Sequence, residues 1–95
     1  MPHTAAAVYG MSRPTIAGTR SALTARSAAV AASQWDQVLA AAGLTGTETD
    51  TRSLEQLFTA MTAAGGVVAQ CGQAQHIRLE CHTRLTAVQE LLQAA

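Results

Sequence analysis

Apolar residues recur at intervals of three, four and seven along most of this chain, which is the spacing of one helix face. The first such series is Ile16, Leu23 and Val30, each seven residues after the last, with small or polar residues between them. It predicts a helix over 14–32, with Pro14 in the first turn, where proline is tolerated. Its apolar seam is narrow and suits packing against one neighbour.

A second helix is predicted directly after the first. Ser33 with Asp36 three residues later reads as a capping pair, and the series Trp35, Val38, Leu39 and Ala42 then follows helical spacing. We therefore expect a joint between two helices near Ala32, with Trp35 facing inward. The segment 43–49, with two glycines and mostly polar residues, predicts the end of this helix.

A third helix is predicted from about Asp50. Ser53 and Gln56 have the spacing of another capping box. Its apolar stripe is formed by Leu54, Leu57, Phe58 and Met61. The pair Gly65-Gly66 interrupts the pattern at a cost of roughly 2 kcal/mol in a helix interior, so it predicts a turn or a hinge within one helix.

The last helix is predicted over Val67–Gln93. One side carries the series Val67, Cys71, Ala74, Ile77, Cys81, Leu85, Val88 and Leu92, a stripe that either faces the core or receives a helix of a partner. Arg78 interrupts this side, and Leu79 and Leu91 lie outside it. Two additional leucines on the longest helix indicate a second contact surface.

These elements predict an all-α fold, a small antiparallel helical bundle of three to four helices. We expect a flexible N-terminal tail over 1–13 and a single helical-bundle domain over 14–95. Twenty-one of the 95 residues are alanine, which favours helix but limits the apolar area that each helix can bury. The isolated domain is therefore expected to have low stability unless a partner covers one face.

Charge and composition exclude several classes of protein. The six arginines balance six acidic residues and do not cluster, which argues against binding of nucleic acid. No apolar run reaches the ~18 residues that a membrane span needs, and the first residues lack the features of a signal peptide. Cys71 and Cys81 lie ten residues apart on one helix, too far apart for a disulfide, so we expect reduced, buried thiols and a cytoplasmic protein.

The chain offers few candidates for catalysis or metal binding. His76, Cys81 and His82 are five and one residues apart, whereas two ligands on one helix face need a spacing of three or four. No Cys–His pair, carboxylate pair or phosphate-binding loop is evident, so we expect no enzyme, no metal and no cofactor. The histidines are expected on the surface.

Two stretches carry a resemblance to a known family. Gln34-Trp35-Asp36-Gln37-Val38-Leu39-Ala40 is similar to the stretch that opens the second helix of FliT-type flagellar export chaperones. The segment 77–92 resembles their long final helix in outline. This chain departs from the family in the glycine-containing break at 43–49, in a final helix with fewer charges, and in the lack of a further regulatory helix after it.

The resemblance implies a small helical chaperone without catalytic chemistry. Such a protein shields an amphipathic C-terminal segment of the filament-cap protein, FliD, and delivers it to the export ATPase complex. Some members also restrain a flagellar transcription regulator. We expect the partner-binding residues on the third and last helices, namely Phe58, Met61, Leu79, Leu85, Val88 and Leu92.

Two other functions remain open. The length and the Gly-Leu-Thr-Gly turn are similar to secreted helical hairpins of the WXG100 type, although Leu44 stands where their tryptophan lies. A co-chaperone of a virulence type III secretion system would also shield an amphipathic segment on its apolar helix faces, but the segment would belong to another cargo. The sequence also leaves open a homodimer and the identity of the cargo.

Overall fold

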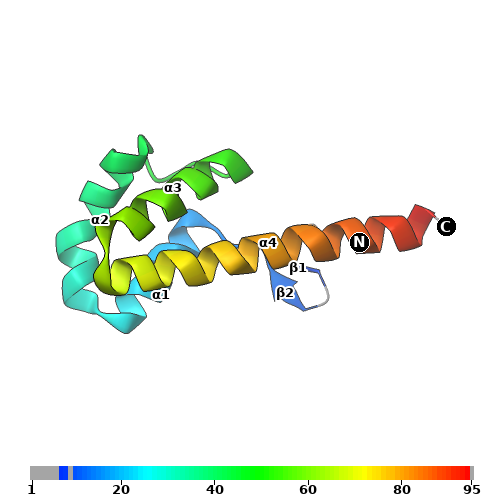
Figure 1. Cartoon of the computed structure of the whole chain (residues 1–95), viewed down its shortest axis with the longest axis horizontal. Helices are drawn as coiled ribbons and strands as arrows, with labels where there is room; N and C mark the ends of the chain where they lie inside the picture. Colours follow the sequence, from blue (N-terminus) through cyan, green and yellow to red (C-terminus); the bar gives the residue numbers. More distant parts are fainter. Residues whose placement is uncertain (1–6, 9, 95) are drawn as a thin grey trace.

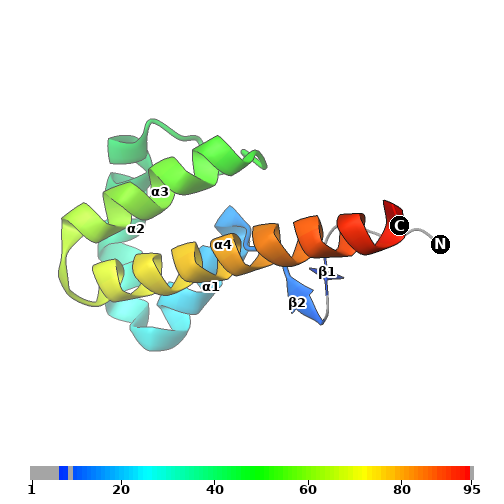
Figure 2. The same cartoon turned by 45° about the vertical axis from the view of Figure 1, so that its right-hand side comes forward.

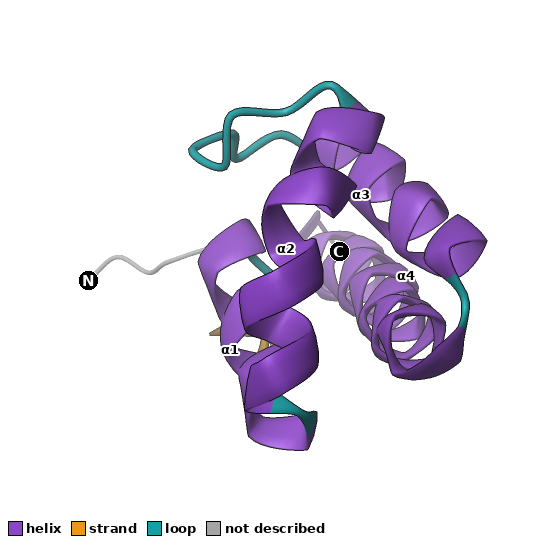
Figure 3. Ribbon diagram, turned by 90° about the vertical axis from the view of Figure 1, so that its left-hand side faces the viewer, coloured by secondary structure: helices purple, strands orange, loops and turns teal. Residues whose placement is uncertain are grey.

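The protein is a small all-α bundle, as the apolar pattern predicts (Figure 1). The computed structural model describes residues 7–8 and 10–94. Its helices are α1 (Ile16–Arg26), α2 (Ala28–Ala42), α3 (Thr51–Ala64) and α4 (Gly66–Ala94). In Figure 3, α1 and α2 lie on one side of the bundle, and α3 and α4 lie side by side on the other.

A short β-hairpin precedes the helices, in the region predicted as a tail. Strands β1 (Ala7–Val8) and β2 (Met11–Ser12) pair antiparallel, with Val8 opposite Met11, and the hairpin packs against α4. Gly10 adopts a φ of 78°, which glycine tolerates at a tight turn. Residues 1–6 and 9 lie outside the described part of the chain, so the prediction of a flexible tail is not tested there.

Arg13 attaches the segment after the hairpin to the loop between α2 and α3. Its guanidinium donates one hydrogen bond to the carbonyl of Thr49 at 3.0 Å and another to Oγ1 of Thr51 at 2.9 Å. The chain then enters α1, where Oγ1 of Thr15 accepts the N–H of Gly18 as an N-cap.

The joint between the first two helices lies at Ser27, not near Ala32 as predicted. Ser27 is extended, with φ −159° and ψ 101°, and it ends α1 and caps α2 at once. Its N–H donates to the carbonyl of Leu23 at 2.9 Å, and its Oγ accepts the N–H of Val30 at 3.3 Å. One serine therefore satisfies backbone groups of both helices without an intervening loop.

Ser33, the predicted cap, lies in the middle of α2. Its hydroxyl donates back to the carbonyl of Val30 at 3.3 Å, the bond by which a serine is accommodated inside a helix. Trp35 is buried, as predicted, but it belongs to the central turns of α2 and not to its start. Ser27 and Ser33 both fit the preference for a cap, and local pattern does not distinguish them.

The break after α2 occurs where the glycines predict it. Gly43 ends α2 in the left-handed conformation with φ 74°, and its N–H donates to the carbonyl of Ala40. In the loop that follows, the Glu48 carboxylate accepts the N–H groups of Thr45 and Gly46, each at 2.9 Å. These backbone hydrogen bonds hold the pKa of Glu48 below its ordinary value.

The start of α3 is capped by Asp50 and not by the predicted Ser53–Gln56 box. The Asp50 carboxylate accepts the N–H of Ser53 at 3.0 Å and its hydroxyl at 2.7 Å. These two bonds, the hydroxyl first, lower the pKa of Asp50. The ionised Asp50 carboxylate is stabilised by the positive end of the helix dipole. Ser53 is the third residue of α3 and donates to this cap instead of forming it.

One connected core joins all four helices. The predicted stripe of α3 is confirmed, because its four apolar residues are all buried. The core consists of Ile16, Leu23, Ala31, Trp35, Val38, Leu54, Leu57, Phe58, Met61, Val68, Cys71 and Leu79. The glycine pair forms a turn, since Gly65 and Gly66 have φ values of 77° and 60°, and α4 returns antiparallel to α3.

The packing of α3 against α4 is the most extensive in the molecule. At Gly72 the helices approach so closely that an added Cβ would lie 2.6 Å from Cβ of Met61. Beyond this contact, α4 continues past the other helices (Figures 1 and 2). Its 29 residues, about 43 Å at ~1.5 Å per residue, nearly span the 48 Å long axis of the molecule.

Candidate protein-binding surface

The face of α4 that meets the bundle is not formed by the longest apolar series of its sequence. The buried residues of α4 are Val68, Cys71, Gly72, Leu79 and His82. Of these only Cys71 belongs to that series. Leu79, which the spacing placed outside that series, is a core residue.

In the second half of α4 this series lies largely on the outside of the molecule. We call the residues Ile77, Cys81, Leu85, Val88 and Leu92 the α4 stripe. Ile77 is 61% exposed, Val88 47% and Leu92 66%, and the neighbouring Leu91 is 71% exposed. Cys81 is exposed and Leu85 is half-buried. Over residues 77–92 this series therefore lies mostly outside the core.

Two features of α4 explain the difference. The helix carries apolar residues on two sides, so its spacing alone does not indicate which side packs on α3. The helix also extends beyond the bundle, so its C-terminal half has no helical neighbour among the described residues (Figures 1 and 2). Of the two additional leucines noted in the sequence, Leu79 is buried in the core and Leu91 is exposed, so they do not lie on one common surface.

The structure divides the six predicted partner-binding residues into two groups. Phe58, Met61 and Leu79 are at most 2% exposed and belong to the core, so they form no surface in this structure. Val88 and Leu92 are exposed on the α4 stripe, and Leu85, one turn before Val88, is half-buried at its edge. Ile77 and Leu91, which were not among the six, extend the exposed apolar surface.

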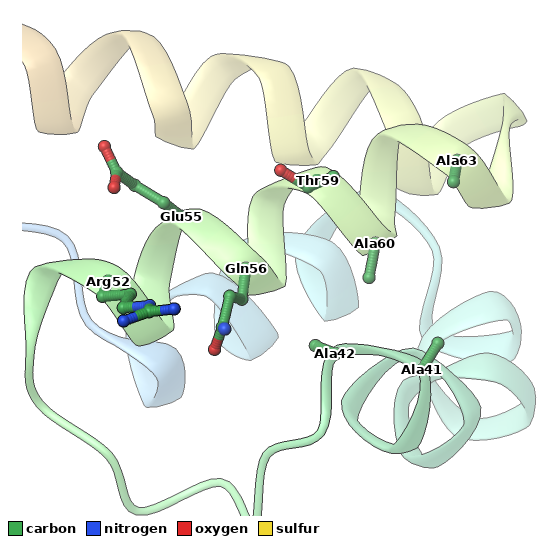
Figure 4. Close-up of a pocket in the computed structure, with 8 residues that line it drawn as sticks. All are labelled: Ala41, Ala42, Arg52, Glu55, Gln56, Thr59, Ala60 and Ala63. Atoms are coloured by element: carbon green, nitrogen blue, oxygen red, sulfur yellow. The ribbon is translucent and has the colours of Figure 1, made fainter.

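Apart from the α4 stripe, the surface has a hollow between α2 and α3 with a volume of about 550 Å³ (Figure 4). Ala41 and Ala42 of α2 face Ala60 of α3 across it, and Arg52 and Gln56 lie toward one end. The complete lining is Ala41, Ala42, Arg52, Glu55, Gln56, Thr59, Ala60 and Ala63. Its walls are mostly short side chains. Another helix could therefore approach the backbone closely here, but few groups are present to bind a small molecule.

The histidines and cysteines occupy unexpected places. His82, expected on the surface, is only 4% exposed, and its Nε2 makes no hydrogen bond within the described part of the chain. The ring of His76 lies 6.0 Å from that of Phe58. Among the described residues, no three His, Cys, Asp or Glu side chains are grouped as they would be around a metal ion.

Both cysteines are free thiols. Cys71 is buried as predicted, and its burial raises the pKa of the thiol, an effect that the charge of Arg26 partly opposes. Cys81 is exposed, which corrects the prediction that both thiols are buried. None of the helices in residues 10–94 contains an apolar stretch long enough to cross a bilayer.

Comparison of the chain with protein-family models, with curated proteins and with solved structures finds no match.

Proposed function

We propose that this protein is a helical adaptor that binds an amphipathic helix of a partner protein on the α4 stripe. The observation that carries the proposal is the exposure of four large apolar side chains, Ile77, Val88, Leu91 and Leu92, on one projecting helix. Contiguous exposed apolar surface of this kind on a small protein marks an interaction site. An amphipathic helix would bury these side chains by packing alongside α4.

The resemblance to FliT-type chaperones supports a specific form of this proposal. In that form the partner is the C-terminal segment of a FliD-like cap protein, which the adaptor shields and delivers to the export ATPase complex. The long final helix with an exposed apolar end supports this form. The position of the first helix joint, at Ser27 and not beside Trp35, removes one of the features on which the resemblance was based. A homodimer and contact with a flagellar transcription regulator remain further proposals.

The test is capture of a FliD C-terminal fragment by the full chain. We expect the wild type to retain the fragment and Val88→Asp/Leu92→Asp to lose it. Each substitution removes an apolar side chain worth roughly 1.5–3 kcal/mol when buried and places a charge in the interface, so affinity should fall at least about 100-fold. Both residues are exposed, so the helical circular dichroism signal should be unchanged.

The matched control places two aspartates elsewhere. Ala29→Asp/Ala40→Asp adds the same charge at exposed positions of α2 and should retain the fragment. Capture that survives in the stripe variant, or that is equally lost in the control, would show that the α4 stripe is not the binding surface. A wild type that retains neither a cap fragment nor a virulence type III cargo contradicts the chaperone form of the proposal.

A further inference from the structure

The charged residues of α4 are distributed unevenly around the stripe. Successive residues of a helix are about 100° apart, so the five stripe residues share a common centre line. Arg78 and Arg84 lie about 60° to either side of that line. Glu80 lies about 100° away and Glu90 about 180° away, on the opposite side of the helix. The nearest charges on both borders of the apolar surface are therefore positive.

Beside Arg78 the surface of α4 adjoins a hollow at the start of α1. Arg78 and Arg13 line one hollow beside the start of α1, and the other side chains of that lining are uncharged. The lining consists of Ser12, Arg13, Pro14, Thr15, Gly18, Ala22, Gln75 and Arg78. The Arg13 guanidinium is hydrogen-bonded to the Thr49 carbonyl and the Thr51 hydroxyl, so Arg78 supplies the charge that a docked group would meet at this border.

We infer that the occupant of the α4 stripe is an amphipathic helix whose apolar face is bordered on both sides by aspartate or glutamate. Leucine-type side chains of this helix would pack on Ile77, Val88 and Leu92, while its carboxylates meet Arg78 and Arg84. Arginine binds a carboxylate through two parallel hydrogen bonds in one plane. Such bidentate pairs select an acidic partner helix and also fix its register along α4. This inference rests on the proposed function, because it names the chemistry of the partner for the same surface.

A second copy of the chain is a poorer occupant. It would bring its own Arg78 and Arg84 to the borders of the interface, so basic side chains of the two copies would be brought together. Like charges at an interface oppose association and select against the wrong partner. A helix bordered by acidic residues brings negative charges to Arg78 and Arg84 and is not repelled.

The test uses two fluorescein-labelled helical peptides and the full-length protein. Both peptides carry the same leucine face, and they differ only in the residues that border it, glutamate in one and lysine in the other. By fluorescence anisotropy we expect the glutamate peptide to bind about tenfold more tightly or better at about 0.1 M salt. The difference should shrink at about 1 M salt, where exposed charges are screened.

Two charge-matched variants locate the effect. Arg78→Glu/Arg84→Glu should invert the preference, so that the lysine peptide binds more tightly. Arg20→Glu/Arg52→Glu makes the same change in net charge at exposed positions of α1 and α3, and it should leave the preference for glutamate in place.

Three results would overturn the inference. The first is equal binding of the two peptides, or a preference that Arg78→Glu/Arg84→Glu leaves unchanged; in that case the stripe binds helices without regard to charge and the proposed function stands. The second is failure of both peptides to bind, with the proposed function then decided by the capture of the cap fragment. The third is a wild-type dimer in sedimentation that Val88→Asp/Leu92→Asp dissociates, which would assign the surface to a second copy.

Discussion

Gly72 is the residue that sets how closely α3 and α4 pack. An added methyl group there would lie 2.6 Å from Cβ of Met61 and 3.3 Å from the carbonyl oxygen of Phe58. Both of these atoms belong to or adjoin the backbone of α3, so neither moves aside through a simple change of rotamer. Relief of the contact requires the two helices to separate.

We therefore predict that Gly72→Ala destabilises the protein, although alanine is the better helix former. Overpacking of a close helix contact costs typically 1–3 kcal/mol, against a gain of up to about 1 kcal/mol in helix propensity. Urea unfolding followed by circular dichroism measures the net loss. Gln73→Ala, at the adjacent exposed position, is the control and should leave the unfolding midpoint nearly unchanged. Equal stability of Gly72→Ala and wild type would contradict the close packing.

His82 shows where prediction from single residues fails. Apart from Cys81, its near neighbours Glu80, Thr83 and Arg84 are polar or charged, and a histidine beside a cysteine gives no indication that it is buried. It becomes 4% exposed because its side of α4 turns toward the bundle, which depends on the rotation of the whole helix. That rotation is a property of the element and not of the residue.

Among the elements, α3 could be predicted well from the sequence because it has one apolar stripe and one polar side. The last helix could be located but not oriented, because either of two apolar faces could have met the core. The hairpin was missed because two residues per strand carry no recognisable alternation. The candidate site was predicted only in part, because the sequence does not show which apolar face of a helix is buried. Val88 and Leu92 lie on the surface, but Phe58, Met61 and Leu79 lie in the core.

The joint between α1 and α2 allows a direct test of which serine ends the first helix. Ser27→Ala removes the side-chain acceptor that caps α2, and we expect a loss of about 0.5–2 kcal/mol. Ser33→Ala should be close to neutral, because Ser33 is exposed and lies inside α2 with its hydroxyl bonded back to Val30. The two variants are compared by thermal and urea unfolding. The opposite order of stability would return the joint to the position that the sequence predicted.

At the scale of the whole molecule, the two halves of α4 differ in how much they pack against the other helices. The first half packs against α3 and α1, whereas the second extends past them with its apolar residues exposed (Figure 2). Local opening is easier where fewer buried contacts hold a helix in place. The same helix should therefore be stable at one end and frayed at the other.

We predict that hydrogen exchange resolves this difference. In the free protein, amides of 86–94 should exchange faster than those of 68–82, and binding of the glutamate-bordered peptide should slow exchange in 86–94 most. Mass spectrometry of peptic fragments gives both measurements. Uniform protection along α4 in the free protein would show that its C-terminal half is held by contacts other than those described.

The opposite orientation of the two apolar faces of α4 has a consequence for how the sequence can change. Substitutions on the outward face of the last turns touch no core residue, so they are free of the stability constraint that restricts Leu79 or Gly72. If the proposed function holds, partner choice and folding are encoded on different sides of the same helix. Residues 85–94 could be exchanged for another outward pattern to retarget the protein while the bundle that presents them stays intact.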